Sequence, residues 1–169
     1  MEIGGGFGGL AAELVQFLDP PVYYLVELPD ALPLAFFYLK SRFSCPIQVL
    51  FRPEEKADVS SRIVLAAPWK LDDLEPRIDL AINTMSFQRM DMDNLRYYFG
   101  QIDRLGTKRM YLVNRNRKRD LSDVVIDQYP IPGRLKLIKD QRWPFGEHRE
   151  RFYLDAEHGR HETARTGTA

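Results

Sequence analysis

The sequence opens on Met1-Glu2-Ile3-Gly4-Gly5-Gly6-Phe7-Gly8-Gly9, which predicts the end of a strand, a glycine loop and the start of a helix. The pattern E-x-G-x-G-x-G is formed by Glu2, Gly4, Gly6 and Gly8. Glycines let a backbone approach a ligand closely, and the following helix offers its N-terminal N–H groups. We therefore expect a cofactor to bind here, in contact with Glu2, Gly4, Gly5, Gly6, Phe7 and Gly8.

The same stretch also satisfies the dinucleotide pattern G-x-G-x-x-G, through Gly4, Gly6 and Gly9. Glu2 separates the two interpretations, because a carboxylate at this turn would repel a pyrophosphate and would favour a cationic ligand. S-adenosylmethionine (SAM) carries an ammonium and a sulfonium group, whereas NAD carries two phosphates. We therefore rank SAM first, with NAD(P) as the alternative cofactor and a merely flexible glycine-rich terminus as a third interpretation.

A second acid supports an adenosine cofactor. Residues 22–28 are apolar and β-rich, and they predict a strand with Glu27 at its carboxyl end, followed by Leu28. Doubly wound folds hold the ribose hydroxyls of an adenosine ligand at this position, about 20 residues after the glycine loop. We expect Glu27 and Leu28 to bind the cofactor. The spacing suits NAD and SAM equally, and a solvated acid is the alternative.

Alternating helix and strand signals predict an α/β fold. A helix over 10–18 would bury Leu10, Leu14, Phe17 and Leu18, and a second helix capped by Asp30 would bury Leu32, Phe36, Leu39 and Phe43. Residues 47–51 and 63–66 are two strand candidates, of which we prefer the second for the main sheet. Trp69 beyond it could flank the adenine, or it could equally be a lid or an interface residue. A third helix should begin at Asp91 and end at Gly106. Strands at 109–113, 135–139 and 151–154 complete the pattern.

The predicted fold is a Rossmann-like sandwich with a mostly parallel sheet and an antiparallel strand late in the chain. Only Met1 precedes Glu2, so the first strand looks truncated. We expect one N-terminally incomplete domain over 1–154 and a disordered tail over 155–169, where apolar periodicity is lost.

Polar residues gather after the strand predicted at 78–83, where ligands bind in open α/β sheets. We expect Asn83 to touch the cofactor and Ser86 and Gln88 to position an acceptor. Arg115 begins a basic run that could grip the phosphate of a nucleotide sugar, although a solvated loop is the alternative. His148 is the candidate catalytic base, with an ordinary surface histidine as the alternative.

Composition limits the function classes. Lysine plus arginine and aspartate plus glutamate number 24 each, so no overall field favours nucleic acid or a membrane surface. Cys45 is the single cysteine, which fits a reducing, cytoplasmic location, and no metal-spaced Cys/His set occurs. No apolar stretch is long enough to span a bilayer. The oligomeric state is left open.

Three blocks resemble the sugar O-methyltransferase family of bacterial SAM-dependent enzymes. They are the loop at 2–9, the segment Tyr24-Leu25-Val26-Glu27-Leu28-Pro29, and Asn83-Thr84-Met85-Ser86-Phe87-Gln88 with Tyr111-Leu112-Val113-Asn114-Arg115. The resemblance implies a Rossmann-like methyltransferase, SAM as the methyl donor and a sugar hydroxyl as the acceptor. It implies that the loop binds the methionyl end of SAM and that Glu27 binds the ribose. The rival hypotheses are an NAD(P)-dependent oxidoreductase and a truncated, non-catalytic fragment.

Overall fold

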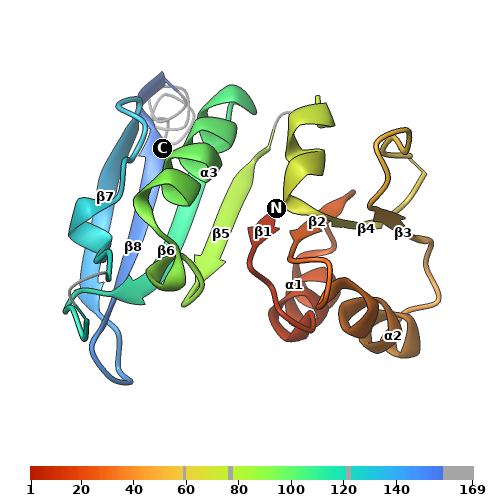
Figure 1. Cartoon of the computed structure of the whole chain (residues 1–169), viewed down its shortest axis with the longest axis horizontal. Coiled ribbons are helices and arrows are strands. Elements are labelled where there is room, and N and C mark those ends of the chain that lie inside the picture. Colours follow the sequence, from red (N-terminus) through yellow and green to blue (C-terminus); the bar gives the residue numbers. More distant parts are fainter. Residues whose placement is uncertain (59, 76–77, 121–122, 158–169) are drawn as a thin grey trace, which may run out of the picture. The chain divides into compact units, whose positions relative to one another are not determined.

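The computed structural model describes residues 1–58, 60–75, 78–120 and 123–157. The chain divides into two compact units, Met1–Glu75 and Pro76–Ala169, drawn from red to yellow and from green to blue in Figure 1. The sequence predicts a single domain over 1–154, and the boundary between the units falls at Glu75 and Pro76.

The first unit contains four parallel strands in the order β3-β4-β2-β1. Their bounds are β1 (Glu2–Ile3), β2 (Tyr23–Val26), β3 (Ile47–Leu50) and β4 (Ile63–Ala66). Glu2 lies opposite Leu25, which lies opposite Leu65 in turn. Both candidate strands therefore belong to the sheet, whereas the sequence favours only the one at 63–66. The segment at 47–50 forms its outer edge.

Helices α1 (Gly9–Leu18) and α2 (Leu32–Arg42) pack against β2 and β4, on the same side of these strands in Figure 1. The predicted buried face of α1 is wrong in part. Leu14 packs partly buried against the core, but Phe17 and Leu18 are exposed, and Ala11, Ala12 and Val15 are buried instead. Small side chains let the helix approach the strands closely. Asp30 does not cap α2, which begins after Ala31 without a side-chain cap.

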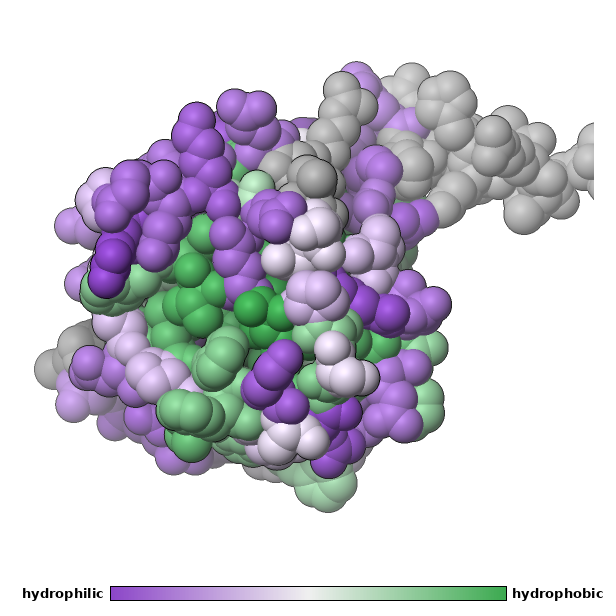
Figure 2. Space-filling model, turned by 90° about the vertical axis from the view of Figure 1, so that its right-hand side faces the viewer, coloured by the Kyte–Doolittle hydropathy of each residue, from purple (hydrophilic) through white to green (hydrophobic). Residues whose placement is uncertain are grey.

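Strand β3 and helix α2 lie on the side of the first unit that Figure 2 shows. Apolar residues form the centre of this face and hydrophilic residues surround it. The 3₁₀ helix η1 (Pro68–Asp73) follows β4, and its Trp69 Nε1 donates a hydrogen bond of 2.9 Å to the carbonyl oxygen of Phe51. Trp69 thus packs beside the residue that follows β3.

The second unit contains strands in the order β5-β6-β8-β7. Their bounds are β5 (Leu80–Thr84), β6 (Arg109–Arg115), β7 (Leu135–Arg142) and β8 (His148–Asp155). Strands β5 and β6 are parallel, and β8 is antiparallel to β6 and to β7. This arrangement confirms the antiparallel pairing predicted late in the chain. Short 3₁₀ turns lie at η2 (Phe87–Arg89) and η3 (Ile126–Gln128).

Helix α3 (Met92–Arg104) begins and ends where the sequence predicts. The Asp91 carboxylate accepts a hydrogen bond of 2.8 Å from the backbone N–H of Asn94, as an N-cap does. Gly106 follows the helix with a φ of 60°, the left-handed conformation that ends helices. The helix buries Leu95, Tyr98, Phe99 and Ile102.

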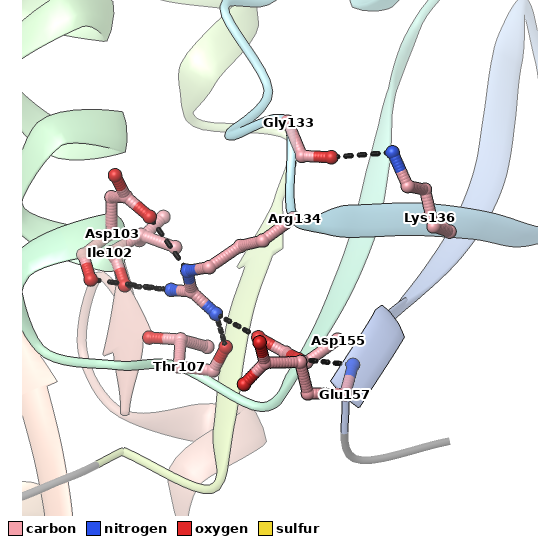
Figure 3. Close-up of polar contacts among 8 residues, drawn as sticks. All are labelled: Ile102, Asp103, Thr107, Gly133, Arg134, Lys136, Asp155 and Glu157. Atoms are coloured by element: carbon pink, nitrogen blue, oxygen red, sulfur yellow. Dashed lines mark hydrogen bonds and ion pairs between the residues drawn. The ribbon is translucent and has the colours of Figure 1, made fainter. Parts of the chain in front are cut away.

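Arg134 joins the C-terminal end of α3 to the two last strands (Figure 3). Its guanidinium donates to the Asp103 and Asp155 carboxylates, each at 2.6 Å, and to the carbonyl oxygens of Ile102 at 3.1 Å and Thr107 at 2.5 Å. The sequence predicts that the tail begins at Asp155, whereas in the structure Asp155 is the last residue of β8. Residues 158–169 of the predicted tail lie outside the described residues.

Candidate functional site

The glycine loop between β1 and α1 has the backbone that its sequence pattern predicts. Gly4, Gly6 and Gly8 have φ angles of 75°, 56° and 88°, all in the left-handed region. An L side chain there costs roughly 1–2 kcal/mol. The three alternating glycines of E-x-G-x-G-x-G are therefore the three residues that turn the chain.

Gly8 is also a point of close packing. It is the N-cap of α1, and its carbonyl accepts a hydrogen bond of 2.9 Å from the N–H of Ala12. A Cβ atom at Gly8 would lie 3.0 Å from Leu39 Cδ1 of α2. The glycine thus lets the start of α1 lie directly against α2.

Glu27 follows β2 directly and folds onto the glycine loop. Its Oε2 accepts a hydrogen bond of 2.6 Å from the N–H of Gly6, and its Oε1 accepts one of 2.7 Å from Leu28. Since an ionised carboxylate offers about four lone-pair positions, acceptor capacity remains for two further hydroxyl groups. The loop and the second acid therefore form one local structure, as the spacing predicts.

Glu2 lies beneath this loop. Its side chain is buried, with 2% of the residue exposed, and its Oε2 accepts a hydrogen bond of 2.8 Å from the Tyr23 hydroxyl. A Cβ atom at Gly5 would lie 2.9 Å from Glu2 Cδ, so the loop backbone covers the carboxyl group. Burial raises the pKa of Glu2 above its ordinary value of 4.5, while the Tyr23 hydrogen bond opposes the shift. The expected direct contact of Glu2 with a ligand remains a prediction, and the structure shows close packing between its carboxyl group and Gly5.

Two apolar side chains of the predicted cofactor site are exposed. Phe7 is 51% exposed, and its ring meets the Tyr38 ring edge-on at a centroid distance of 5.1 Å. Leu28, next to Glu27, is 61% exposed. Exposed apolar side chains beside a binding loop are surfaces that a ligand can cover.

In the second unit, the predicted polar residues form a hydrogen-bond network at the carboxyl ends of β5 and β6. Asn83 is buried, and its Oδ1 accepts from the Phe87 N–H at 3.2 Å and from Asn114 Nδ2 at 2.8 Å. Its Nδ2 donates to Ser86 Oγ. Sequence analysis did not single out Asn114, whose signal is a polar residue at the end of a buried strand.

Gln88 extends this network to the end of β6. Its backbone N–H donates to Asn114 Oδ1 at 3.2 Å, and its side-chain Oε1 accepts from the Arg115 N–H at 2.8 Å. Asn83, Ser86 and Gln88 are therefore brought together, but several of their polar atoms already bind one another. Their cofactor and acceptor contacts stay predictions.

The basic run after β6 is organised by an acid. Asp123 Oδ2 accepts a hydrogen bond of 2.9 Å from the N–H of Arg119 and forms an ion pair of 2.9 Å with Arg115 Nη1. The backbone hydrogen bond from Arg119 lowers the pKa of Asp123 most, although burial opposes the shift. Arg115 therefore has an internal partner as well as its predicted acceptor role.

His148 begins β8 directly opposite Arg115 in the β6–β8 ladder. Its Nδ1 lies 3.3 Å from the carbonyl oxygen of Phe145. Side chains of directly opposed residues lie on the same face of an antiparallel pair. The candidate base and the candidate anion-binding arginine are thus neighbours, and their roles stay predictions.

Two kinds of structure are absent from the described residues. Among them, no group of three or more His, Cys, Asp or Glu side chains could hold a metal ion. In the same part of the chain, no helix combines the length and the hydrophobicity needed to cross a bilayer.

Comparison with known proteins supports the fold. No protein-family model matches the sequence, and no curated protein matches it either. A structure reported for the conversion of a disulfide bond into a thioacetal group during echinomycin biosynthesis matches 99% of this chain and 81% of its own, with a TM-score of 0.62 and 13% identity.

Two more solved structures are similar. The pyocyanin biosynthetic protein PhzM has a TM-score of 0.61 and 14% identity over 92% of this chain and 49% of its own. Magnesium protoporphyrin IX methyltransferase (ChlM) from Synechocystis PCC 6803, with bound SAM, has a TM-score of 0.60 and 12% identity over 92% of this chain and 68% of its own. The chain thus spans about half the length of PhzM. This chain has the Rossmann-like fold of SAM-dependent methyltransferases.

Proposed function

We propose that this chain is a cytoplasmic SAM-dependent O-methyltransferase that acts on a hydroxyl of a sugar or nucleotide sugar. The observation that carries the proposal is the hydrogen bond of 2.6 Å between the Gly6 N–H and Glu27 Oε2, which joins the glycine loop to the acid after β2. Support also comes from the three left-handed glycines and from the likeness to the fold of ChlM, which was solved with SAM.

Three parts of the first unit hold the cofactor in this proposal. The loop from Gly4 to Gly8 approaches the methionyl end, and Glu27 accepts hydrogen bonds from the ribose hydroxyls. Glu2, whose carboxyl group packs closely against Gly5, favours the cationic methionyl end of SAM. When bound, SAM supplies an electrophilic methyl group on a sulfonium.

The transfer is an in-line displacement. The glycine loop and Glu27 would hold SAM with its methyl group in line with the acceptor hydroxyl. Bound SAM would supply that methyl group to the hydroxyl oxygen and leave as S-adenosylhomocysteine, while the hydroxyl proton would pass to a base. His148 is the proposed base, and Ser86, Gln88 and Arg115 are the proposed acceptor-binding residues. Much of the rate in such a reaction can come from alignment of the two reactants.

Calorimetric titration of the full chain with S-adenosylhomocysteine tests the proposal. We expect saturable binding that weakens at least about tenfold in Glu27→Gln, because an amide cannot replace a carboxylate that accepts several hydrogen bonds. Glu13→Gln, at an exposed position on α1, is the matched control and should bind normally. Absence of binding, or binding of NADH instead, would overturn the proposed cofactor. Transfer of labelled methyl groups to a panel of free and nucleotide-linked sugars then tests the acceptor.

A further inference from the structure

A second candidate site in the first unit is lined by none of the residues assigned to the cofactor. Between α2 and β3 is a cleft of about 560 Å³, lined by the loop that follows Leu28, by α2 and by the end of β3. It belongs to the apolar face that Figure 2 shows. Its volume falls within the roughly 300–1,000 Å³ that small-molecule sites occupy.

Aromatic rings form the walls of the cleft, and they are held in place. Phe51 meets the Trp69 ring edge-on at 5.4 Å, and its carbonyl oxygen accepts the Trp69 indole hydrogen bond. Its N–H donates to Glu55 Oε2 at 2.6 Å. On the facing helix, the rings of Phe36 and Phe37 lie edge-on at 5.7 Å. Phe51 is therefore fixed on one side of the cleft by these contacts, and Phe36 and Phe37 form the facing side.

The remaining lining residues decide the charge of a ligand. Pro29 and Pro33 add apolar surface, and of the described residues that line the cleft Asp30 alone is charged. The N-terminal end of α2 adds roughly half a positive charge, which is less than the full negative charge of the carboxylate. Phenylalanine faces also attract cations.

We propose that this cleft binds a small amphipathic amine, with its aromatic body between Phe51 and the rings of α2 and its ammonium group at Asp30. An anionic molecule would face Asp30 without a compensating cation in the lining, and a purely apolar one would leave the carboxylate unused. The site is independent of methyl transfer, so it does not require the proposed function.

The indole N–H of Trp69 reports binding directly, because it hydrogen-bonds to the wall residue Phe51. In ¹⁵N-labelled full chain, its NMR signal is identified by comparison with Trp143→Phe. Unlabelled tryptamine, tryptophol and indole-3-acetate then serve as matched cationic, neutral and anionic probes. We expect tryptamine to shift the Trp69 signal saturably and to bind about three- to tenfold more tightly than tryptophol, with indole-3-acetate weakest.

Two variants locate the site. Asp30→Asn should remove the preference for tryptamine over tryptophol, whereas Phe37→Ala should weaken both probes. Leu34→Ala is the control, because Leu34 is exposed on the same helix but does not line the cleft.

Three results would overturn the proposal. They are the absence of a saturable shift with tryptamine, a charge preference that persists in Asp30→Asn, and displacement of tryptamine by S-adenosylhomocysteine, which would make the cleft part of the cofactor site. A concentration-dependent shift without ligand that Val49→Asp abolishes would make it a self-association surface and would equally overturn it.

Discussion

Gly8 is the residue at which backbone conformation and packing coincide. Its φ of 88° and the 3.0 Å approach of a hypothetical Cβ to Leu39 both oppose any side chain. We expect Gly8→Ala to lower the free energy of unfolding by about 1–2 kcal/mol and to weaken S-adenosylhomocysteine binding. Urea unfolding and calorimetry measure the two effects.

Gly100→Ala provides the control for this substitution. Gly100 is exposed in α3, and no atom lies within 4 Å of its hypothetical Cβ. Alanine there should raise the free energy of unfolding by about 0.5–1 kcal/mol, since glycine is unfavourable inside a helix. Equal effects of the two substitutions would contradict the role given to Gly8.

Glu2 makes stability depend on pH. Because burial raises its folded-state pKa above 4.5, the folded chain retains a proton there that the unfolded chain has already released. The stabilising contribution of Glu2 is therefore complete below pH 4.5 and is lost as the pH rises through the raised pKa. Glu2→Gln mimics the protonated form and should gain stability relative to the natural chain over this rise.

Urea unfolding of both chains from pH 4 to pH 8 measures the difference. Glu13→Gln, at an exposed position, should show a nearly constant difference. A Glu2→Gln difference that is also constant with pH would mean that the carboxyl group is not buried as described.

At the scale of elements, Arg134 acts as a staple between α3, β7 and β8. Its guanidinium forms ion pairs with Asp103 and Asp155 and also donates hydrogen bonds to carbonyl oxygens at the C-terminal end of α3 (Figure 3). Arg134→Met keeps much of the aliphatic stem but removes these hydrogen bonds, so we expect a loss of about 2–3 kcal/mol of unfolding free energy. Lys136→Met is the control, because Lys136 binds only the Gly133 carbonyl among the described residues. Similar losses of unfolding free energy in both variants would contradict the stabilising role given to the Arg134 contacts.

The elements also show what the sequence could predict. The glycine loop, the acid after β2 and both ends of α3 follow from local chemistry, because left-handed glycines and capping acids act within a few residues. The hydrophobic pattern does not indicate most of the buried face of α1. Small alanine side chains fill this face, and they give a weaker hydrophobic signal than the larger Phe17 and Leu18. The sequence does not show that β3 belongs to the main sheet, because its pairing with β4 is a long-range contact.

The site network was predicted only in part for the same reason. Position after a strand indicated Asn83 and Gln88, but not that each would bind Asn114, 31 and 26 residues away in sequence. Such pairs depend on the register of β5 and β6, which no local pattern specifies.

At the scale of the whole molecule, each compact unit carries one tryptophan, Trp69 in the first and Trp143 in the second. In Trp143→Phe, fluorescence during urea unfolding therefore reports the first unit. A ligand that binds only the folded state adds about 2.7 kcal/mol at a concentration 100 times its Kd. We expect S-adenosylhomocysteine to shift the Trp69 transition by this amount, because the glycine loop and Glu27 belong to that unit.

The same measurement separates the rival cofactors. NADH at equal concentration should leave the Trp69 transition unchanged, since an acid at the start of the loop suits a cationic ligand better than a pyrophosphate. Glu27→Gln in the same background should lose most of the shift with S-adenosylhomocysteine while retaining its own transition. A shift with NADH alone would instead support a dehydrogenase, because the spacing from the loop to Glu27 suits either adenosine cofactor.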